Sequence, residues 1–344
     1  MGKKQERREY LPITCTMATH AVSSLSRALS KDPLMLVYGG KKVEVYSVSD
    51  AVTHLGYSAK RLFDYMLLLL TKYNRNSGDW TNASVCFTLQ DYMEIMGYEN
   101  TRLMRYKCFE QVKADIFKLG SLQLMQESAW WFGLVSDAGM VNTAGEQATK
   151  KDVINGKAYI EVTFPQSLLK HLRECRFIVP FLVSLLRRIP HNENAYALAK
   201  RMILHCSQAN NHDKANKYRL SVQNLLDACP AIKALDTGNV RRTFEKSMNC
   251  LSMPPDGGEP IIEWCYVHAG RLCTPTEIQT KRLSHEDWLA LVVEFEPLHL
   301  HEGMEYADRT RLDSAHDLFC VPSPHRIPPL QFHQEAGITC SQKE

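Results

Sequence analysis

Two series of amphipathic helices run along the chain, and each is followed by strand-like segments. In the second series, the apolar and polar positions predict three helices and then two strands, over residues 195–206, 221–229, 238–251, 261–270 and 288–297. This is the order of elements in a winged-helix domain, a helix-turn-helix unit with an attached β-hairpin, whose third helix is the one that enters the DNA major groove. Thr237 precedes that helix, where a threonine side chain can cap the first turn.

The first half of the chain has the same order of elements. The pattern predicts three helices and two strands over residues 58–73, 87–97, 101–119, 129–135 and 157–164. Ser58 is expected to cap the first of these helices, and Gly97 to end the second. The segment 136–156 contains glycine, aspartate and lysine, which predicts an exposed loop between the two strands.

The two third helices share one apolar register. Four positions match at a constant separation of 132 residues: Cys108, Val112, Ile116 and Leu119 match Val240, Phe244, Met248 and Leu251. The steps of four, four and three residues place each set on one helix face. Three further pairs keep a similar separation, namely Phe63 with Tyr196, Phe87 with Tyr218 and Trp131 with Trp264. The register therefore predicts a tandem repeat of one module.

We thus expect an α+β, mostly helical protein with two tandem winged-helix domains joined by a helical linker. The expected division is an N-terminal arm with a hairpin (1–54), a first winged-helix domain (55–164), a linker (165–193), a second winged-helix domain (194–300) and a flexible tail (301–344). Within the arm, the hairpin falls near 34–48 and a short helix near 21–29. The linker is expected to be a helix, a break near Pro180 and a short apolar segment.

Composition places the chain among soluble globular proteins, with 344 residues, 44% hydrophobic and 23% charged. No apolar run approaches the ~20 residues needed to span a bilayer, and no apolar signal core follows the basic start, so we expect a cytoplasmic protein without a membrane partner. The 11 cysteines are scattered without a CxxC pair, which favours a reducing compartment over a disulfide framework. The net charge of +3 is low for a non-specific nucleic-acid binder, so a DNA site must come from local clustering.

Polar side chains follow the face of the 238–251 helix that lies opposite its apolar stripe. The candidates on that face are Asn239, Arg242, Lys246 and Asn249, with Arg241 and Thr243 on its flanks. Arginine can bond a guanine edge and asparagine an adenine edge through two hydrogen bonds each, while lysine and threonine suit phosphates. An ordinary solvated helix face has the same residue types, and this alternative stays open.

Further basic residues surround the second module. Arg271, Lys281 and Arg282 lie between its two predicted strands, where a basic hairpin tip can lie along a phosphate backbone or in the minor groove. Arg219, with Lys214 and Lys217, precedes its second helix and is a candidate phosphate contact from the other side. Ordinary surface loops are the alternative for both groups.

The third helix of the first module has a more mixed exposed face. It combines Lys107, Gln111 and Lys118 with Leu103 and Ala114, which favours assembly or an auxiliary DNA contact over base recognition. Trp130 and Trp131 are neighbours on a predicted strand, where adjacent side chains point to opposite sides. One of them is therefore a candidate partner surface, with packing under the linker helix as the alternative.

Catalytic signatures are scarce. The chain has no P-loop, no HExxH motif and no zinc-ligand spacing, so we expect no enzyme activity, no cofactor and no metal. His299 and His301 match the two-histidine metal motif of rolling-circle nucleases, with Tyr306 as the downstream nucleophile, but no following strands complete such a site. A metal-dependent nicking protein is therefore a minor alternative.

Three stretches resemble a known family. They are FTLQDYMEIMGYENTRLMRYKCFEQVKADI, then YIEVTFPQSLLKHL with NAYALAKRMILHC, and finally VRRTFEKSMNCL with IIEWCYV and LVVEFEP. In pattern and order they resemble the theta-type plasmid replication initiators, which bind iteron repeats through tandem winged-helix domains. The likeness covers residues 55–300, and the long 136–156 segment departs from it.

The resemblance implies a sequence-specific DNA-binding protein that starts replication at the repeats of a plasmid origin. It implies that residues 239–246 enter the major groove and that the first module helps dimerisation or contacts flanking DNA. It also implies a homodimer in equilibrium with the monomer, and host replication proteins as partners. A tandem winged-helix transcription regulator and a protein–protein scaffold without a DNA role are the alternatives. The sequence specifies neither the DNA site nor which host proteins bind.

Overall fold

The structure is a computed structural model, and the part of the chain that it describes is interrupted. The described residues are 10–15, 19, 22, 25, 34–38, 41–47, 55–77, 81–126, 130–174, 177–188, 193–208, 218–253 and 260–297. The tail and the candidate nuclease residues His299, His301 and Tyr306 lie outside them, as does almost all of the helix expected near 21–29.

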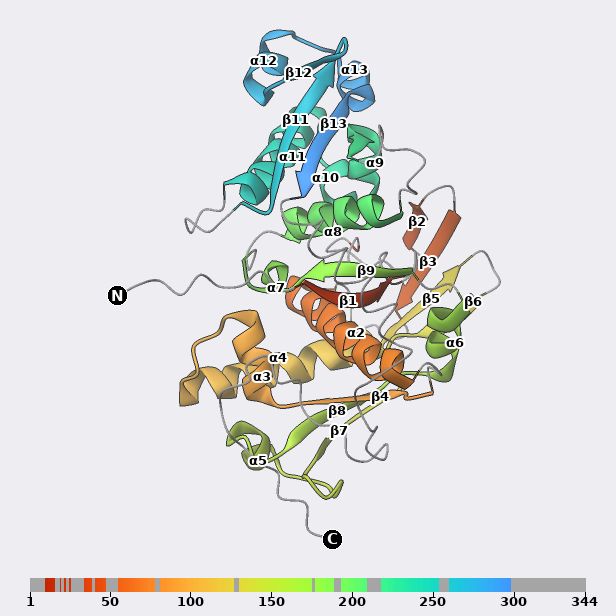
Figure 1. The fold of residues 1–344 in the computed structure, drawn as a ribbon, viewed down its shortest axis with the longest axis vertical. Coiled ribbons are helices and arrows are strands. Elements are labelled where there is room, and N and C mark those ends of the chain that lie inside the picture. The colour runs from red at the N-terminus through yellow and green to blue at the C-terminus, as the bar shows by residue number, and fades with distance from the viewer. Residues whose placement is uncertain are drawn as a thin grey trace.

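The second module, in the upper part of Figure 1, contains the three predicted helices and a small sheet. Its elements are α8 (Glu193–Gln208), β10 (Arg219–Ser221), α9 (Val222–Asp227), α10 (Pro230–Lys233), α11 (Thr237–Ser252), β11 (Ile262–His268), β12 (Arg271–Cys273), α12 (Pro275–Thr280), α13 (His285–Ala290) and β13 (Val292–Pro297). The strands form an antiparallel sheet in the order β10-β13-β11-β12.

The first module repeats this arrangement. Its elements are α2 (Tyr57–Ser77), β4 (Ser84–Phe87), α3 (Leu89–Met96), α4 (Arg102–Gly120), β7 (Asp137–Val141), α5 (Lys150–Ile154) and β8 (Tyr159–Thr163). Its sheet has the order β4-β8-β7 and is also antiparallel. In both modules, the strand before the second helix pairs with the last strand, which pairs in turn with a later strand. That strand is β11 in the second module, directly after the third helix, and β7 in the first module, where β5 (Leu122–Gln126) and β6 (Trp130–Gly133) come between the third helix and β7. The fold is therefore α+β with two tandem winged-helix modules, as predicted.

The apolar register of the third helices is confirmed. Seven of the eight matched side chains are buried and Ile116 packs against the same core partly exposed. Residues at the helix starts explain where α4 and α11 begin. The Thr101 side chain accepts a hydrogen bond from the Met104 amide, and the Asp236 side chain accepts one from the Asn239 amide. The prediction of Thr237 as a cap was wrong by one residue, because the carboxylate of Asp236 serves the exposed amides and Thr237 is already helical.

Two residue matches and one cap predicted outside the third helices were wrong. Trp264 lies on β11, within the sheet of its module, whereas Trp131 lies on a strand outside the β4-β8-β7 sheet of its own module. Phe87 ends β4 and its counterpart by position is Leu220 rather than Tyr218, because each precedes the residue that caps the second helix. Ser58 does not cap the first helix, since α2 already begins at Tyr57.

The predicted wings differ from the observed ones. In the first module, the segment 136–156 is not a loop, since β7 and α5 lie within it and β7 pairs with β8. In the second module, the connection contains β12, α12 and α13, and Trp288 is a buried residue of α13 rather than the start of a strand. A tryptophan beside apolar neighbours fits a strand pattern, but the Ser284 side chain caps a helix that begins at the next residue.

The arm and the linker form strands as well. The hairpin predicted near 34–48 is confirmed as β2 (Leu34–Tyr38) and β3 (Lys41–Ser47), which join β5 (Leu122–Gln126) and β6 (Trp130–Gly133) in the sheet order β2-β3-β5-β6. The linker is not simply helical. It contains α6 (Gln166–Glu174), β9 (Phe177–Leu182) and α7 (Ser184–Arg188), and β9 pairs with β1 (Tyr10–Cys15) from the arm.

A buried polar contact joins the two modules. The α2 carboxylate of Asp64 is fully buried, accepts a hydrogen bond from the Tyr196 hydroxyl and pairs with the Lys200 ammonium, both on α8. One turn earlier on α2, buried Lys60 pairs with Glu193 at the start of α8. The β1–β9 ribbon lies between the same two helices (Figure 1). The first helices of the two modules are therefore held at one fixed orientation.

We expect Asp64→Ala to lower the free energy of unfolding by about 3–5 kcal/mol, because it removes the carboxylate that neutralises a buried ammonium. Replacing both charges, with Asp64→Leu and Lys200→Met together, should restore most of this loss. Urea unfolding measures both, with the exposed Glu263→Ala as a control that should stay within about 0.5 kcal/mol. An Asp64→Ala protein as stable as the parent would show that this contact contributes little.

Candidate nucleic-acid interface

The exposed face of α11 carries four of the predicted site residues. We call Asn239, Arg242, Lys246 and Asn249 the polar face of α11. Arg242 and Lys246 are exposed, whereas Asn249 is half-buried. A shallow hollow of about 400 Å³ runs along this face, lined by Arg242, Glu245, Lys246, Asn249, Cys250 and Met253. The face is therefore accessible to a large partner such as a DNA groove.

The start of α11 holds an amide and a guanidinium side by side. The Asp236 carboxylate accepts hydrogen bonds from the Asn239 backbone amide at 3.0 Å and from the Asn239 side-chain amide at 2.8 Å. These bonds lower the pKa of Asp236 below its ordinary value. The Arg242 guanidinium donates to the Asn239 side-chain oxygen at 2.9 Å. The two side chains best suited to base edges are thus pre-positioned next to each other at the helix N-terminus.

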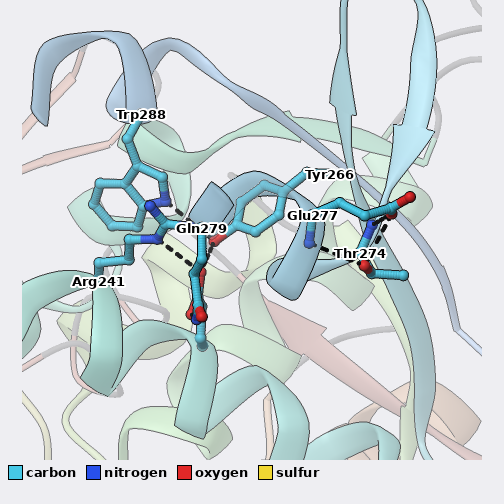
Figure 2. A network of polar contacts seen from close by, with 7 residues as sticks. Arg241, Tyr266, Thr274, Glu277, Gln279 and Trp288 are labelled. Carbon is cyan, nitrogen blue, oxygen red and sulfur yellow. Dashed lines mark hydrogen bonds and ion pairs between the residues drawn. The ribbon is translucent and has the colours of Figure 1, made fainter. Parts of the chain in front are cut away.

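Arg241 points in a different direction. Its Nε donates to the carboxylate of Glu245 at 2.9 Å, one turn further along α11. Glu245 is only 6% exposed and also accepts hydrogen bonds from the Tyr266 hydroxyl at 3.1 Å and from the Gln279 amide at 3.0 Å. Figure 2 shows Arg241, Tyr266 and Gln279 converging from α11, β11 and α12. Arg241 therefore belongs to an internal network instead of the polar face.

This network, which we call the Glu245 network, extends to α13. The Trp288 indole N–H donates to the Tyr266 hydroxyl at 3.1 Å, and both side chains are buried (Figure 2). Burial raises the pKa of Tyr266, and the neighbouring Glu245 charge raises it further, so the phenol stays protonated and can donate. Through Glu245, Tyr266, Gln279 and Trp288, the third helix is tied to β11, α12 and α13.

The wing tip is a tight turn between β11 and β12. His268 pairs with Arg271, which leaves Ala269 and Gly270 as a two-residue turn with φ of 50° and 76°. Positive φ at both positions fits the type I′ turn that closes right-handed twisted hairpins. Arg271 is exposed beside this turn. The Lys281 ammonium lies 3.1 Å from His268 Nδ1, so the residue after α12 returns to the same tip.

Of two further basic candidates in the second module, one is exposed and the other is paired with a carboxylate. Arg282 is exposed next to Lys281. Arg219 lies opposite Glu294 on paired strands, and its guanidinium contacts that carboxylate at 2.5 and 2.7 Å. Its charge is therefore already matched within the sheet. Thr243 is half-buried on the flank of α11. Lys214 and Lys217 lie outside the described residues.

The corresponding face of the first module is different. At the positions 132 residues before the polar face of α11, the helix α4 has Lys107, Glu110, Ala114 and Phe117. Gln111 is exposed, but its side-chain amide is bonded to Ser58 and Asp115. At the positions that correspond to Asn239 and Arg242, the first module thus has no pair of asparagine and arginine. The side chains of Trp130 and Trp131 lie outside what the structure describes.

No family model matches this chain, and no curated protein matches it in sequence. Among solved structures, the chain is similar to domains 2 and 3 of RctB. A crystal structure of selenomethionine derivatives of these domains aligns with a TM-score of 0.46 and 10% identity, covering 82% of this chain and 99% of that one. A second crystal structure of the same domains aligns with a TM-score of 0.43 and 11% identity, covering 84% and 99%.

The structure adds observations on metals and membranes that concern its described residues only. Among them, no group of three histidine, cysteine, aspartate or glutamate side chains is placed to hold a metal ion. None of the helices in the same ranges is long and apolar enough to cross a bilayer.

Sequence reasoning missed the Glu245 network. One signal was present, because Arg241 and Glu245 are four residues apart and so adjacent on a helix. Tyr266, Gln279 and Trp288 come from segments whose packing no local pattern specifies.

We expect Glu245→Ala to destabilise the second module by about 3 kcal/mol, because it leaves the half-buried Arg241 guanidinium and the Tyr266 hydroxyl without their shared acceptor. The adjacent Lys246→Ala is the matched control, since that side chain is exposed, and should change stability by less than about 0.5 kcal/mol. Denaturant unfolding compares the two, and hydrogen exchange should show faster opening of β11 and α12 only in Glu245→Ala. Equal stability of the two variants would contradict the role given to this network.

Proposed function

We propose that this protein binds a specific double-stranded DNA sequence through α11 and the β11–β12 wing of its second module. The observation that supports this most directly is the Asn239–Arg242 pair. It lies at the exposed N-terminal end of the third helix of a winged-helix module. In this class of fold, that end of the helix faces the base edges in the major groove.

The residues of the site have separate roles in this proposal. Arg242 and Asn239 contact base edges, where each can form two parallel hydrogen bonds. Lys246 and Asn249 extend the contact along the groove. Exposed Arg271, Lys281 and Arg282 at the wing contact phosphates. Arg241 instead positions the helix through Glu245, and Arg219 and Thr243 stay outside the contact set.

We further propose that the DNA is a set of origin repeats and that the protein is a plasmid replication initiator. Support comes from the tandem winged-helix modules with a joining segment and from the resemblance of residues 55–300 to the iteron-binding initiators. In this role the protein acts in the cytoplasm by binding, without catalysis, cofactor or metal. Host replication proteins are its partners, and it exchanges between homodimer and monomer.

Arg242→Ala should weaken binding to the cognate site by about 1–3 kcal/mol, because it removes a contact to a base edge. Its affinity for unrelated DNA should change far less. Arg219→Ala is the matched control, since that arginine is already paired with Glu294 and should leave both affinities unchanged. Fluorescence anisotropy at several salt concentrations measures them. An Arg242→Ala protein with unchanged cognate affinity would rule out this base contact.

The initiator role predicts where the protein binds. Footprinting on the DNA that flanks its gene should protect a series of short direct repeats, each spanning roughly one to two helical turns. A single palindrome over a promoter would instead identify a transcription regulator. If no sequence is protected and the protein binds any DNA in a salt-sensitive way, both the initiator role and the regulator role are contradicted.

A further inference from the structure

An apolar stripe is exposed along α4 of the first module. Leu103, Tyr106 and Phe117 are 67%, 52% and 60% exposed, which makes α4 the main site of large exposed apolar side chains among the described residues. With Glu110 and Ala114 they follow spacings of three, four, four and three residues, so all lie on one helix face. Three large exposed apolar side chains on one helix face, two before Glu110 and one after it, indicate a contact surface instead of a scattered set of surface residues.

The stripe is arranged symmetrically about Glu110. Lys107 and Lys113 stand three residues before and after it. Tyr106 and Ala114 stand four residues on either side, and Leu103 and Phe117 seven residues on either side. Residues of the same chemical class therefore stand at equal distances before and after Glu110, except that the large Tyr106 matches the small Ala114.

Such an arrangement suits a second copy of the same helix. When two helices pack antiparallel around a two-fold axis, each residue shares a layer with the residue equally far beyond the axis on the other copy. With the axis at Glu110, the Tyr106 ring lies beside Ala114 of the second copy, and Leu103 beside Phe117. Large side chains next to small ones interdigitate well. The register is thus self-complementary in size.

The two Glu110 carboxylates share the layer at the axis, and the lysines around them offset this like charge. At the axis, each Glu110 has Lys107 and Lys113 one turn away on its own helix, and the same lysines of the second copy at similar distances. Lys150 on α5 already pairs with Glu110, and its ammonium lies 3.8 Å from the centre of the Tyr106 ring. This ion pair and cation–π contact hold two central residues of the stripe in place before association.

DNA fits this face less well. Where α11 has Arg242, the helix α4 has the acidic Glu110, and where α11 has Asn249 it has Phe117. A carboxylate and an exposed phenyl ring oppose contact with phosphates and base edges. The tip of the first wing also carries an acidic residue, Glu146, instead of an arginine.

We propose that two copies of this protein associate through α4, antiparallel, with the two-fold axis at Glu110. This inference rests on one part of the proposed function, the homodimer, and specifies its contact surface and register. It does not depend on the proposed DNA contacts of the second module.

The register can be tested with cysteine pairs in the full chain. Glu110→Cys should form a disulfide with itself across the axis under mild oxidation. Leu103→Cys and Phe117→Cys should cross-link to each other when the two variants are mixed, and far less when each is alone. Because the chain already has 11 cysteines, the linked peptides are identified by mass spectrometry. Lys118→Cys, on α4 but off the stripe, is the control that should not cross-link.

Self-association is measured by sedimentation on the same full-length protein. Phe117→Glu should weaken it by roughly tenfold or more, because a charge enters an apolar layer of the interface. Leu272→Glu is the matched control, since Leu272 is also 60% exposed but lies on the wing of the second module. It should leave self-association unchanged.

Two results would overturn the proposal. A protein that stays monomeric at every concentration reached would remove both this surface and the proposed homodimer. A dimer that survives Phe117→Glu, and that forms no disulfide across the axis in the Glu110→Cys variant, would remove the α4 surface while the proposed homodimer stands. Loss of DNA binding in Arg242→Ala alone bears only on the second module, so the two proposals fail separately.

Discussion

The structure depends on a buried pairing of charges between α2 and α8. Asp64 and Lys200 are both almost fully removed from water, and such charges are stable there only while they contact each other. The contact therefore permits one relative position of the two helices. Because α4 packs on α2 and α11 packs on α8, that position also sets the relation between the two third helices. The distance from the α4 stripe to the polar face of α11 is thus fixed by a pair of charges that belongs to neither.

The two modules show which part of a repeated fold is constrained and which is not. Their third helices keep the same apolar register because each packs this face into the core of its module beside the first helix, α4 on α2 and α11 on α8. Nothing in that core constrains the opposite face. There, Arg242 in one copy corresponds to Glu110 in the other, and Lys246 to Ala114. A single packing solution thus supports two surfaces of different chemistry, one basic and polar and the other largely apolar.

Sequence periodicity predicted the long helices, but it failed for short strands and for strands that contain proline. Helical spacing located α2, α4, α8 and α11 to within a few residues, apart from their caps. The strands β4 and β10 have only four and three residues, which is too short for an alternating pattern to be visible. Prolines Pro12 and Pro180 argue against a strand, yet they lie opposite each other on the β1–β9 ribbon. The match of Trp131 with Trp264 was wrong because sequence separation carries no information on which sheet a strand joins.

The candidate site shows the same limit at single-residue scale. Arg241 and Arg242 are neighbours with the same chemistry, and the helical periodicity of the sequence placed both at or beside the polar face. The roughly 100° turn between them sends one toward Glu245 and the other toward solvent. The Glu245 network ties α11 to β11, α12 and α13, so in the proposed DNA complex the helix and the wing would present one preformed surface. The proposed binding would then require little ordering of the wing, and its affinity would depend chiefly on the contacts of the polar face and the wing tip.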